Sequence, residues 1–512
     1  MRNLLHAWPR FFAGDSHASA LRRVAKNAAV PMAASICNRL LDFAFAFIWL
    51  KALGPTDVGR YTWAVLVVGY SEILISFGLG TLITREVARD PSASGRYLGT
   101  ALFMRGAIWL LMIMATVFIG GPLAAPLDLT PEMVIALLAL TVGIGISSAS
   151  GLVSALFNAH ELMEYPALVS IFTTLAKVTL GVAVLAAGFG FVGLALVSIG
   201  VNLMTATALV GLLIVVIGRP RLEFDRRFAA LLFSQSYPLM LNSLLATIFF
   251  RIDGLMLRSM SGDAPLGWYS TAYKFIDGLN VISSSVTLAL FPVLSRATAR
   301  AGAGSKAATV SEEPRGFLQV TRLGLKALIT MAMPLSVGLT FLADPLIRAF
   351  AGDDYLPHSA IALQIIVWCL PLSFVNGLLQ YALIAANQQR FITISFIVAV
   401  VFNVISNILL IPRFSYAGAG ISTIASELVL LGPFLIAAYR HVGQLHLLAL
   451  SWRPALAAAG MAPVVWVSAQ VSPLLSIALG GVAYGGILAA IGGLGPDERR
   501  MIQSVLPLRR DV

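Results

Sequence analysis

Long apolar runs recur along almost the whole chain and are separated by short polar segments. A helix that crosses a bilayer needs about 20 mostly apolar residues. Fourteen runs of this size lie at 28–50, 58–82, 98–120, 132–156, 166–187, 191–217, 230–257, 266–294, 323–349, 358–385, 391–412, 416–439, 454–470 and 473–494. The pattern therefore predicts an all-α, polytopic membrane protein with fourteen transmembrane helices.

Composition supports lipid as the solvent. The chain has 512 residues, of which 58% are hydrophobic and 12% are charged. Soluble domains carry roughly 25% charged residues, so this chain has too little charge to coat a water-soluble particle. The net charge of +11 comes from short basic clusters between apolar runs, without interleaved aromatic residues. This distribution is typical of membrane topology signals and argues against a nucleic-acid partner.

The positions of Lys and Arg predict the orientation. With the N-terminus placed in the cytoplasm, 24 basic residues fall in inside segments. Five fall in outside segments, namely Lys51, Arg60, Arg258, Arg348 and Arg413. This bias predicts a multi-pass protein with both termini cytoplasmic.

The N-terminal segment 1–27 lacks the pattern of a cleaved signal peptide. It and the C-terminal tail 495–512 are therefore expected to be cytoplasmic.

An internal repeat predicts two lobes. Pro31 precedes Tyr61 by 30 residues, and Pro238 precedes Tyr269 by 31 residues. Six predicted helices separate the two copies, so both have the same orientation in the membrane. We expect an N-lobe at 28–217 and a C-lobe at 230–439, related by an axis along the membrane normal and enclosing a central cavity. The two helices within 454–494 fall outside the repeat.

Charged side chains inside the predicted spans are candidate functional residues, because a charge in hydrocarbon is costly unless it faces water or a partner. The candidates for substrate binding are Arg39, Asp42, Arg105, Lys177, Arg251, Asp253, Lys274 and Asp277. One hypothesis is that the cations line the central cavity and hold phosphate, whose oxygens match an arginine fork. The alternative is structural ion pairing within the bundle.

The spacing of these charges gives two kinds of expectation. Arg39 and Asp42 lie three residues apart on one helix face, and Lys274 and Asp277 repeat that arrangement. Arg251 and Asp253 are two residues apart, so they point in different directions and need partners elsewhere.

Glu72 and Glu427 are expected near mid-membrane and are candidates for ion coupling. The alternative for either carboxylate is a pair with Arg39, Arg105 or Lys177. Amide side chains also occur within spans, at Asn202, Asn242, Asn280, Asn376, Gln380, Asn403 and Asn407. Such amides can bind sugar hydroxyls or hold helices together.

The sequence gives no positive sign of catalysis. It lacks a Walker-type phosphate loop, an HExxH motif, a CxxC motif and a recognisable nucleophile motif. The short outside loops also disfavour an enzyme with a periplasmic catalytic loop. We therefore expect a transporter without a cofactor or a bound metal.

The chain resembles the polysaccharide-biosynthesis flippases (Wzx type) of the MOP superfamily, which also contains MATE drug exporters and lipid II flippases. The resemblance spans nearly the whole chain. The residues that carry it are Leu53-Gly54-Pro55 with Gly59 and Tyr61, Thr84-Arg85-Glu86, Pro238, Arg251-Ile252-Asp253, Gly267-Trp268-Tyr269, Pro292, Leu342-Ala343-Asp344-Pro345-Leu346, and Asn403 to Pro412 leading into Gly418-Ala419-Gly420.

This resemblance implies a two-lobed carrier that moves an undecaprenyl-pyrophosphate-linked repeat unit to the outer leaflet by alternating access. It implies that Arg39, Arg251 and Lys274 contact the head group, and that membrane lipids are partners. A polysaccharide polymerase and a co-polymerase are further candidate partners. Exopolysaccharide, capsule and O-antigen are the candidate products.

Two other functions fit the same resemblance. One is a cation-coupled multidrug exporter of the MATE type, although that fold usually has twelve helices. The other is a lipid II flippase, which shares the helix number and the head-group chemistry.

Overall fold

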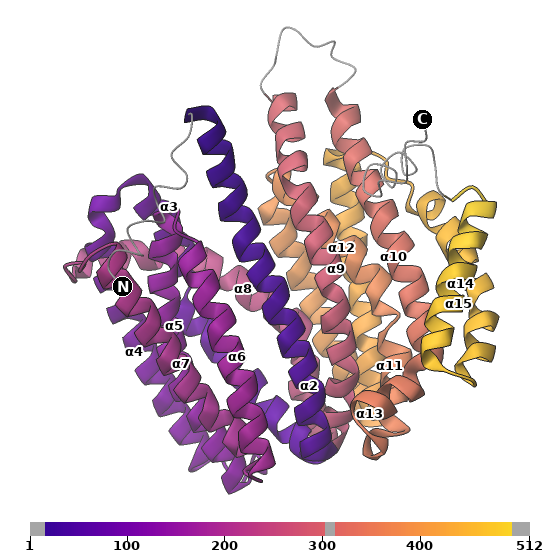
Figure 1. Ribbon diagram of the computed structural model, residues 1–512, viewed down its shortest axis with the longest axis horizontal. Coiled ribbons are helices and arrows are strands. Elements are labelled where there is room, and N and C mark those ends of the chain that lie inside the picture. The colour runs from indigo at the N-terminus through magenta and orange to yellow at the C-terminus, as the bar shows by residue number, and fades with distance from the viewer. Residues whose placement is uncertain (1–15, 303–312, 494–512) are drawn as a thin grey trace, which may run out of the picture. The chain divides into compact units, whose positions relative to one another are not determined.

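The computed structural model describes residues 16–302 and 313–493, and this part of the chain is helical without a β-strand (Figure 1). The α-helices are α2 (Ser16–Ser76), α3 (Leu79–Arg89), α4 (Ser94–Gly120), α5 (Pro131–Ala159), α6 (Glu164–Ala186), α7 (Gly190–Val216), α8 (Arg226–Ser261), α9 (Asp263–Gly302), α10 (Glu313–Phe350), α11 (His358–Ile366), α12 (Cys369–Ala385), α13 (Gln389–His441), α14 (Leu447–Ala469) and α15 (Pro473–Ala490). Two short 3₁₀ turns, η2 (Pro91–Ala93) and η3 (Asp353–Tyr355), complete the order. The all-α prediction is confirmed.

The described part contains 11 helices that are long and apolar enough to cross a membrane, or up to 12 when the bent pair α11–α12 counts as one span. A multi-pass membrane protein is thus confirmed, whereas the count of fourteen stays a prediction. The predicted cytoplasmic N-terminal segment lies partly outside the described residues, which begin at Ser16, and the C-terminal tail lies wholly outside them.

Two helices contain a break in the middle. In α2, 61 residues long, Gly54 has φ 72° and ψ 168°; in α13, 53 residues long, Ser415 has φ 51° and ψ −130°. An unbroken helix of 61 residues would measure about 90 Å, roughly three times the thickness of the hydrocarbon core. A helix of this length must therefore end or bend because it exceeds the thickness of the membrane, and the breaks at Gly54 and Ser415 allow this. Gly54 has no Cβ and so adopts positive φ without strain.

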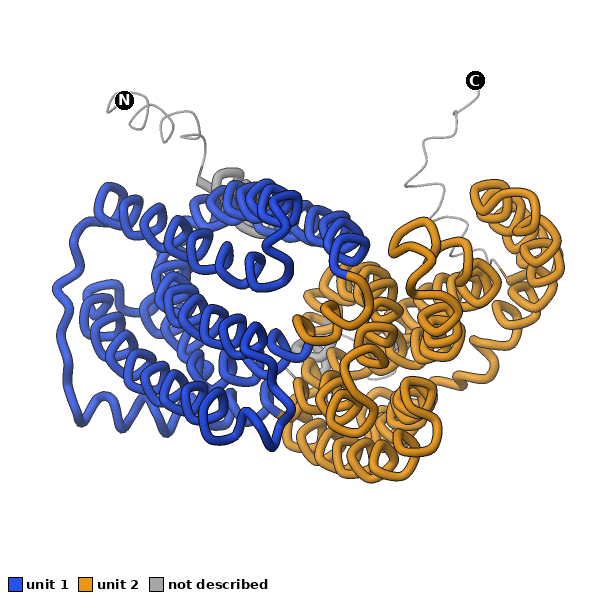
Figure 2. Tube along the Cα trace, turned by 90° about the horizontal axis from the view of Figure 1, so that it is seen from below, with its two compact units in different colours: residues 1–53, 63–244 blue, residues 54–62, 245–512 orange. Residues whose placement is uncertain are grey.

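The chain divides into two compact units (Figure 2). Unit 1 contains residues 1–53 and 63–244, and unit 2 contains residues 54–62 and 245–512. The division falls within α8, whereas the lobes expected from the repeat divide before that helix. The lobe boundaries taken from the repeat stay a prediction.

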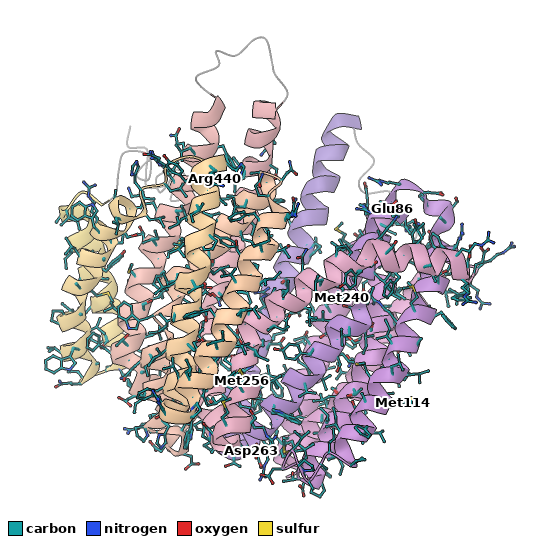
Figure 3. The ribbon with its side chains drawn as sticks, turned by 180° about the vertical axis from the view of Figure 1, so that it is seen from behind. Glu86, Met114, Met240, Met256, Asp263 and Arg440 are labelled. Carbon is teal, nitrogen blue, oxygen red and sulfur yellow. The ribbon has the colours of Figure 1, made fainter. Side chains whose placement is uncertain are left out.

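Unit 1 packs around α3, α5 and α7. On α3 the apolar residues Leu79, Leu82, Ile83 and Val87 follow helical spacing, and all four are buried. They form one core with apolar side chains of α5 and α7, among them Leu213. The outer surface of the unit is also apolar, and Met114 on α4 is 68% exposed (Figure 3). Such exposed apolar helices are stable in lipid, where the usual penalty for apolar exposure is absent.

Unit 2 contains the last two helices as an integral part. Helices α14 and α15 pack against each other and against α10 (Figure 1). Met461 of α14 and Tyr484 of α15 belong to one core with Val337 of α10. The Tyr484 hydroxyl also donates a hydrogen bond of 2.8 Å to the carbonyl of Thr330. The two helices that fall outside the sequence repeat therefore extend unit 2.

The nine residues 54–62 belong to unit 2 although α2 on both sides belongs to unit 1. They cross the start of α9, and two glycines, Gly59 and Gly267, lie at the crossing. Each glycine precedes the tyrosine of its repeat copy by two residues. A Cβ on Gly59 would overlap the carbonyl of Asp263, and a Cβ on Gly267 would overlap the carbonyl of Pro55. The two helices can approach this closely because neither glycine carries a side chain.

Ion pairs fix the same crossing. Arg60 contacts Asp57 at 3.2 Å and Asp263 at 3.1 Å, and Arg258 contacts Asp263 at 2.6 Å. Asp263 and Arg440 lie at opposite ends of unit 2 (Figure 3). The charge bias predicts that the end of the unit with this crossing faces the outside.

Substitution tests this crossing. We expect Gly59→Ala and Gly267→Ala each to destabilise the protein by about 1–3 kcal/mol, because the added methyl group forces two backbones apart. Thermal unfolding of the purified protein in detergent measures the effect. The matched control is Gly69→Ala, at a position on α2 where the space around the new Cβ is open. Equal unfolding temperatures for all three variants would show that the crossing is not tightly packed.

Candidate functional site

A cavity of about 400 Å³ lies inside unit 2, between α8, α9, α12 and α13. Many of its lining residues are polar, although the helices that surround it are mostly apolar. The polar and aromatic lining residues are Thr247, Phe250, Arg251, Tyr273, Asp277, Asn280, Ser283, Ser284, Thr287, Ser373, Asn376, Gln380, Tyr381, Phe396, Glu427 and Phe434. The volume falls within the range of small-molecule sites.

Helical spacing explains how these side chains reach one cavity. On α9 the polar residues Asp277, Asn280, Ser284 and Thr287 follow one another at intervals of three, four and three. Residues three or four apart share one helix face, so they form a polar stripe on an otherwise apolar helix. Ser373, Asn376 and Gln380 make a similar stripe on α12. Sequence reasoning identified the amides but missed these hydroxyl residues, although the stripe is visible in the sequence.

Arg251 of α8 forms the ionic contact of the cavity. Its guanidinium Nη2 lies 3.3 Å and 3.4 Å from the two carboxylate oxygens of Asp277 on α9. The same guanidinium lies 5.2 Å from the ring centre of Tyr273. Arg251 therefore pairs with a residue of another helix. The sequence predicted this, because Arg251 and Asp253 are two residues apart and point in different directions. The i,i+3 spacing in the sequence placed Asp277 on one helix face with Lys274, but Asp277 contacts Arg251. Lys274 lies one turn earlier on α9 and is half-buried.

Asp253 points to different partners. It is 4% exposed and accepts hydrogen bonds from the hydroxyl of Tyr269 at 2.5 Å, from Thr423 at 3.2 Å and from the backbone of Gly254 at 2.8 Å. It is not among the residues that line the described cavity. Its contacts link α8, α9 and α13, which are three of the helices around the cavity.

Glu427 of α13 faces the cavity and is 3% exposed. Its carboxylate accepts a hydrogen bond of 2.6 Å from the amide of Asn376, which also donates to the backbone carbonyl of Glu427 at 2.9 Å. The structure thus gives this carboxylate an amide partner, instead of the cations weighed from the sequence.

In unit 1 the predicted charges form separate contacts. Asp42 of α2 forms an ion pair with Lys177 of α6. Arg39 is exposed, and no ion pair or hydrogen bond joins it to another described side chain. The i,i+3 spacing of Arg39 and Asp42 therefore places the two on one face without pairing them.

Arg105 of α4 is held by backbone carbonyls. It is 6% exposed and donates to Ser148 at 2.5 Å and Ser76 at 3.1 Å. Glu72 on α2 attracts it electrostatically, although no ion pair within 4 Å joins the two in the described structure. Arg105 thus connects α2, α4 and α5 of unit 1.

The other amides named from the sequence divide between two roles. Asn280, Asn376 and Gln380 line the cavity. Asn202 donates to the carbonyl of Gly143 at 3.0 Å, and Asn403 donates to Ser426 at 3.0 Å, so these two hold helices together. Within the described residues, no group of three or more His, Cys, Asp or Glu side chains is arranged to hold a metal ion.

Comparison with solved structures identifies the fold. A lipid II flippase, MurJ, in an inward closed conformation superposes with a TM-score of 0.72 at 14% identity, covering 91% of this chain and 99% of that one. An inward-facing multidrug resistance MATE family transporter of the MOP superfamily gives 0.64 at 14% identity, covering 79% of this chain and 94% of that one. The Vibrio cholerae MATE transporter VcmN gives 0.56 at 14% identity, covering 81% and 97%. The fold is that of the MOP superfamily.

Family models give the more specific assignment. The model described as "Polysaccharide biosynthesis protein" matches residues 24–298, and the model MatE matches residues 238–409. The first match spans more than half of the chain. The chain therefore belongs to the polysaccharide biosynthesis protein family of the MOP superfamily. No curated protein sequence matches it.

A double-mutant cycle tests the ionic contact in the cavity. We expect Arg251→Ala and Asp277→Ala each to destabilise the protein and the double variant to lose less than the sum. The coupling free energy should be about 1 kcal/mol, because the cavity partly hydrates the pair. Thermal or denaturant unfolding in detergent measures it.

The matched control is the pair Arg348 and Asp353, 2.9 Å apart, whose side chains are 67% and 78% exposed. Its coupling should lie within about 0.5 kcal/mol of zero. Equal couplings for the two pairs would mean that the cavity does not strengthen the contact between Arg251 and Asp277.

Proposed function

We propose that this protein is a flippase that carries an undecaprenyl-pyrophosphate-linked oligosaccharide repeat unit across the bacterial inner membrane for polysaccharide biosynthesis. The supporting observation is the polar cavity of about 400 Å³ between helices that are apolar enough to cross a membrane. A hydroxyl group moved into hydrocarbon without a partner costs roughly 2–7 kcal/mol, so an oligosaccharide cannot cross a bare bilayer. Amides and hydroxyls along the cavity replace the water that the sugar loses.

Membership of the polysaccharide biosynthesis protein family supports the same substrate class. Alternating access would expose the cavity first to the cytoplasm and then to the outside, while the lipid tail stays in the bilayer. The proposal includes cytoplasmic termini and a polysaccharide polymerase and co-polymerase as partners.

Among the predicted cations, Arg39 is our candidate for contact with the pyrophosphate. It is exposed, and no described side chain neutralises it. A guanidinium without a carboxylate partner can offer two parallel hydrogen bonds to phosphate oxygens. Arg105, Lys177 and Lys274 remain further candidates, although Lys177 has a carboxylate partner.

Glu427 is our candidate for ion coupling. It is a buried carboxylate that faces the cavity and has an uncharged partner, Asn376. Ionisable groups with this placement are typical of proton and cation pathways in transporters. Glu72 is the second candidate, and the attraction to Arg105 makes a structural role for it the alternative.

Deletion of the gene tests the proposed function. We expect surface or secreted polysaccharide to disappear and the lipid-linked precursor to accumulate on the cytoplasmic side, because the polar head cannot cross without the carrier. Both quantities can be measured in the same cells. Unchanged polysaccharide without precursor accumulation contradicts the proposal. Lysis on depletion would favour the lipid II flippase, and increased drug sensitivity would favour the exporter.

Complementation tests the role of Arg39. We expect Arg39→Ala to restore export poorly, since a lost hydrogen bond to a charged group costs about 1.5–3 kcal/mol. Lys51→Ala, which removes an exposed cation from the same helix, is the matched control. Full restoration by Arg39→Ala, at a protein level equal to that of the control, would remove Arg39 from the site.

A further inference from the structure

The cavity of unit 2 carries no excess of positive charge. Among its lining residues, Arg251 is the one cation, and Asp277 and Glu427 are carboxyl groups. Asp277 already faces Arg251 at 3.3 Å. The second carboxyl group, Glu427, has an amide as its partner. Whether Glu427 is protonated or ionised, the cavity is neutral or negative overall, and an anionic ligand gains no net attraction there.

Two buried polar atoms of the lining have no hydrogen-bond partner. They are Oδ1 of Asn376, in a residue 4% exposed, and Oγ1 of Thr287, in a residue 2% exposed. A buried polar atom without a partner costs about 1–3 kcal/mol, so almost all such atoms in proteins are satisfied. Both atoms belong to residues that line the cavity. A ligand or water in the cavity that reaches them would supply the missing hydrogen bonds.

The unsatisfied groups call for a ligand that donates hydrogen bonds. Oδ1 of Asn376 can only accept, because it is a carbonyl oxygen, and the amide nitrogen of the same residue is already used by Glu427. The carboxylate of Glu427 also accepts when it is ionised. A hydroxyl group is a donor and suits both positions, whereas a carboxylate or phosphate oxygen offers only further acceptors.

The remaining lining suits a ring with polar edges and apolar faces. Hydroxyl and amide groups lie on α9 and α12, at Asn280, Ser283 and Gln380 among others, while Tyr273 and Tyr381 contribute aromatic rings. Specific small-molecule sites combine aromatic surface with a few convergent polar groups in this way. A pyranose has hydroxyls around its edge and C–H groups on its faces, so it matches both parts of the lining.

From this arrangement we infer that the cavity of unit 2 binds uncharged sugar residues and excludes acidic sugars and the pyrophosphate. The inference deepens the proposed function and rests on it. Sugar hydroxyls donate to Asn376 and Glu427 and share a hydrogen bond with Thr287. In its ionised form Glu427 repels an anionic sugar, and specificity against a competitor comes from such an unfavourable contact.

Binding to the purified full-length protein tests the inference. The probes are diacetylchitobiose and lactose as neutral disaccharides, digalacturonate as an acidic one, and inorganic pyrophosphate. Saturation-transfer NMR in detergent micelles gives the dissociation constant of each. We expect a neutral disaccharide to bind with a millimolar dissociation constant, and digalacturonate and pyrophosphate not to compete with it.

Variants of the lining assign the binding to this cavity. We expect Asn376→Ala and Thr287→Val each to weaken binding of the neutral disaccharide about fivefold to tenfold. Asn202→Ala, which removes a half-buried amide from unit 1, is the matched control and should leave binding unchanged. Thermal unfolding of each variant establishes that it is folded.

Glu427→Gln provides a gain of binding that a misfolded protein cannot produce. The substitution keeps the shape and removes the charge, so we expect digalacturonate to bind this variant and to compete with the neutral disaccharide. Three results would each overturn the inference: no binding of either neutral disaccharide, binding of digalacturonate or pyrophosphate to the unaltered protein in competition with them, and equal effects of Asn376→Ala and Asn202→Ala.

The two proposals can fail separately. Loss of polysaccharide export on deletion, together with any of those three results, leaves the flippase in place and removes the sugar site from this cavity. Normal export on deletion, together with specific sugar binding, keeps the site and rejects the flippase.

Discussion

Lipid does not hydrogen-bond, and every polar group within the membrane must therefore find a partner inside the protein. Most polar side chains of this structure obey that constraint. Arg105 is held by two backbone carbonyls, and Asp253 accepts three hydrogen bonds. Asn202 bonds to a backbone carbonyl. Among the buried atoms without a hydrogen-bond partner, Oδ1 of Asn376 and Oγ1 of Thr287 belong to residues that line the cavity.

The same constraint separates structural charges from functional ones. A charge with complete partners, such as Asp253, fixes helices and has nothing left to offer a ligand. A charged or ionisable group that lines a cavity can still interact with a ligand, and Glu427 and Arg251 both line the cavity. The cavity thereby has a defined electrostatic character, neutral or negative, that a count of basic residues in the membrane does not reveal. The strong net charge of +11 says nothing about this local balance.

Small residues have an equally physical role at the other end of unit 2. Gly59 and Gly267 allow two backbones to approach until a Cβ would overlap a carbonyl. The ion pairs of Arg60 and Arg258 with Asp263 then hold residues 54–62 within unit 2. A nine-residue segment flanked on both sides by unit 1 is thus bound firmly to unit 2. The chain passes from one unit to the other at both ends of this segment and again within α8.

The sequence alone determined the solvent and the secondary structure, because about twenty consecutive apolar residues have one stable form in lipid, which is the helix. It also predicted which charges and amides lie within the membrane, and the family resemblance followed from the order and spacing of short motifs. It could not determine which charges meet, since pairing depends on contacts between helices distant in the chain. Asp277 lies three residues from Lys274 yet faces Arg251, and Asp42 lies three residues from Arg39 yet pairs with Lys177. Only the tertiary structure decided these pairs and enclosed the cavity, because partners on different helices are chosen by packing and not by spacing.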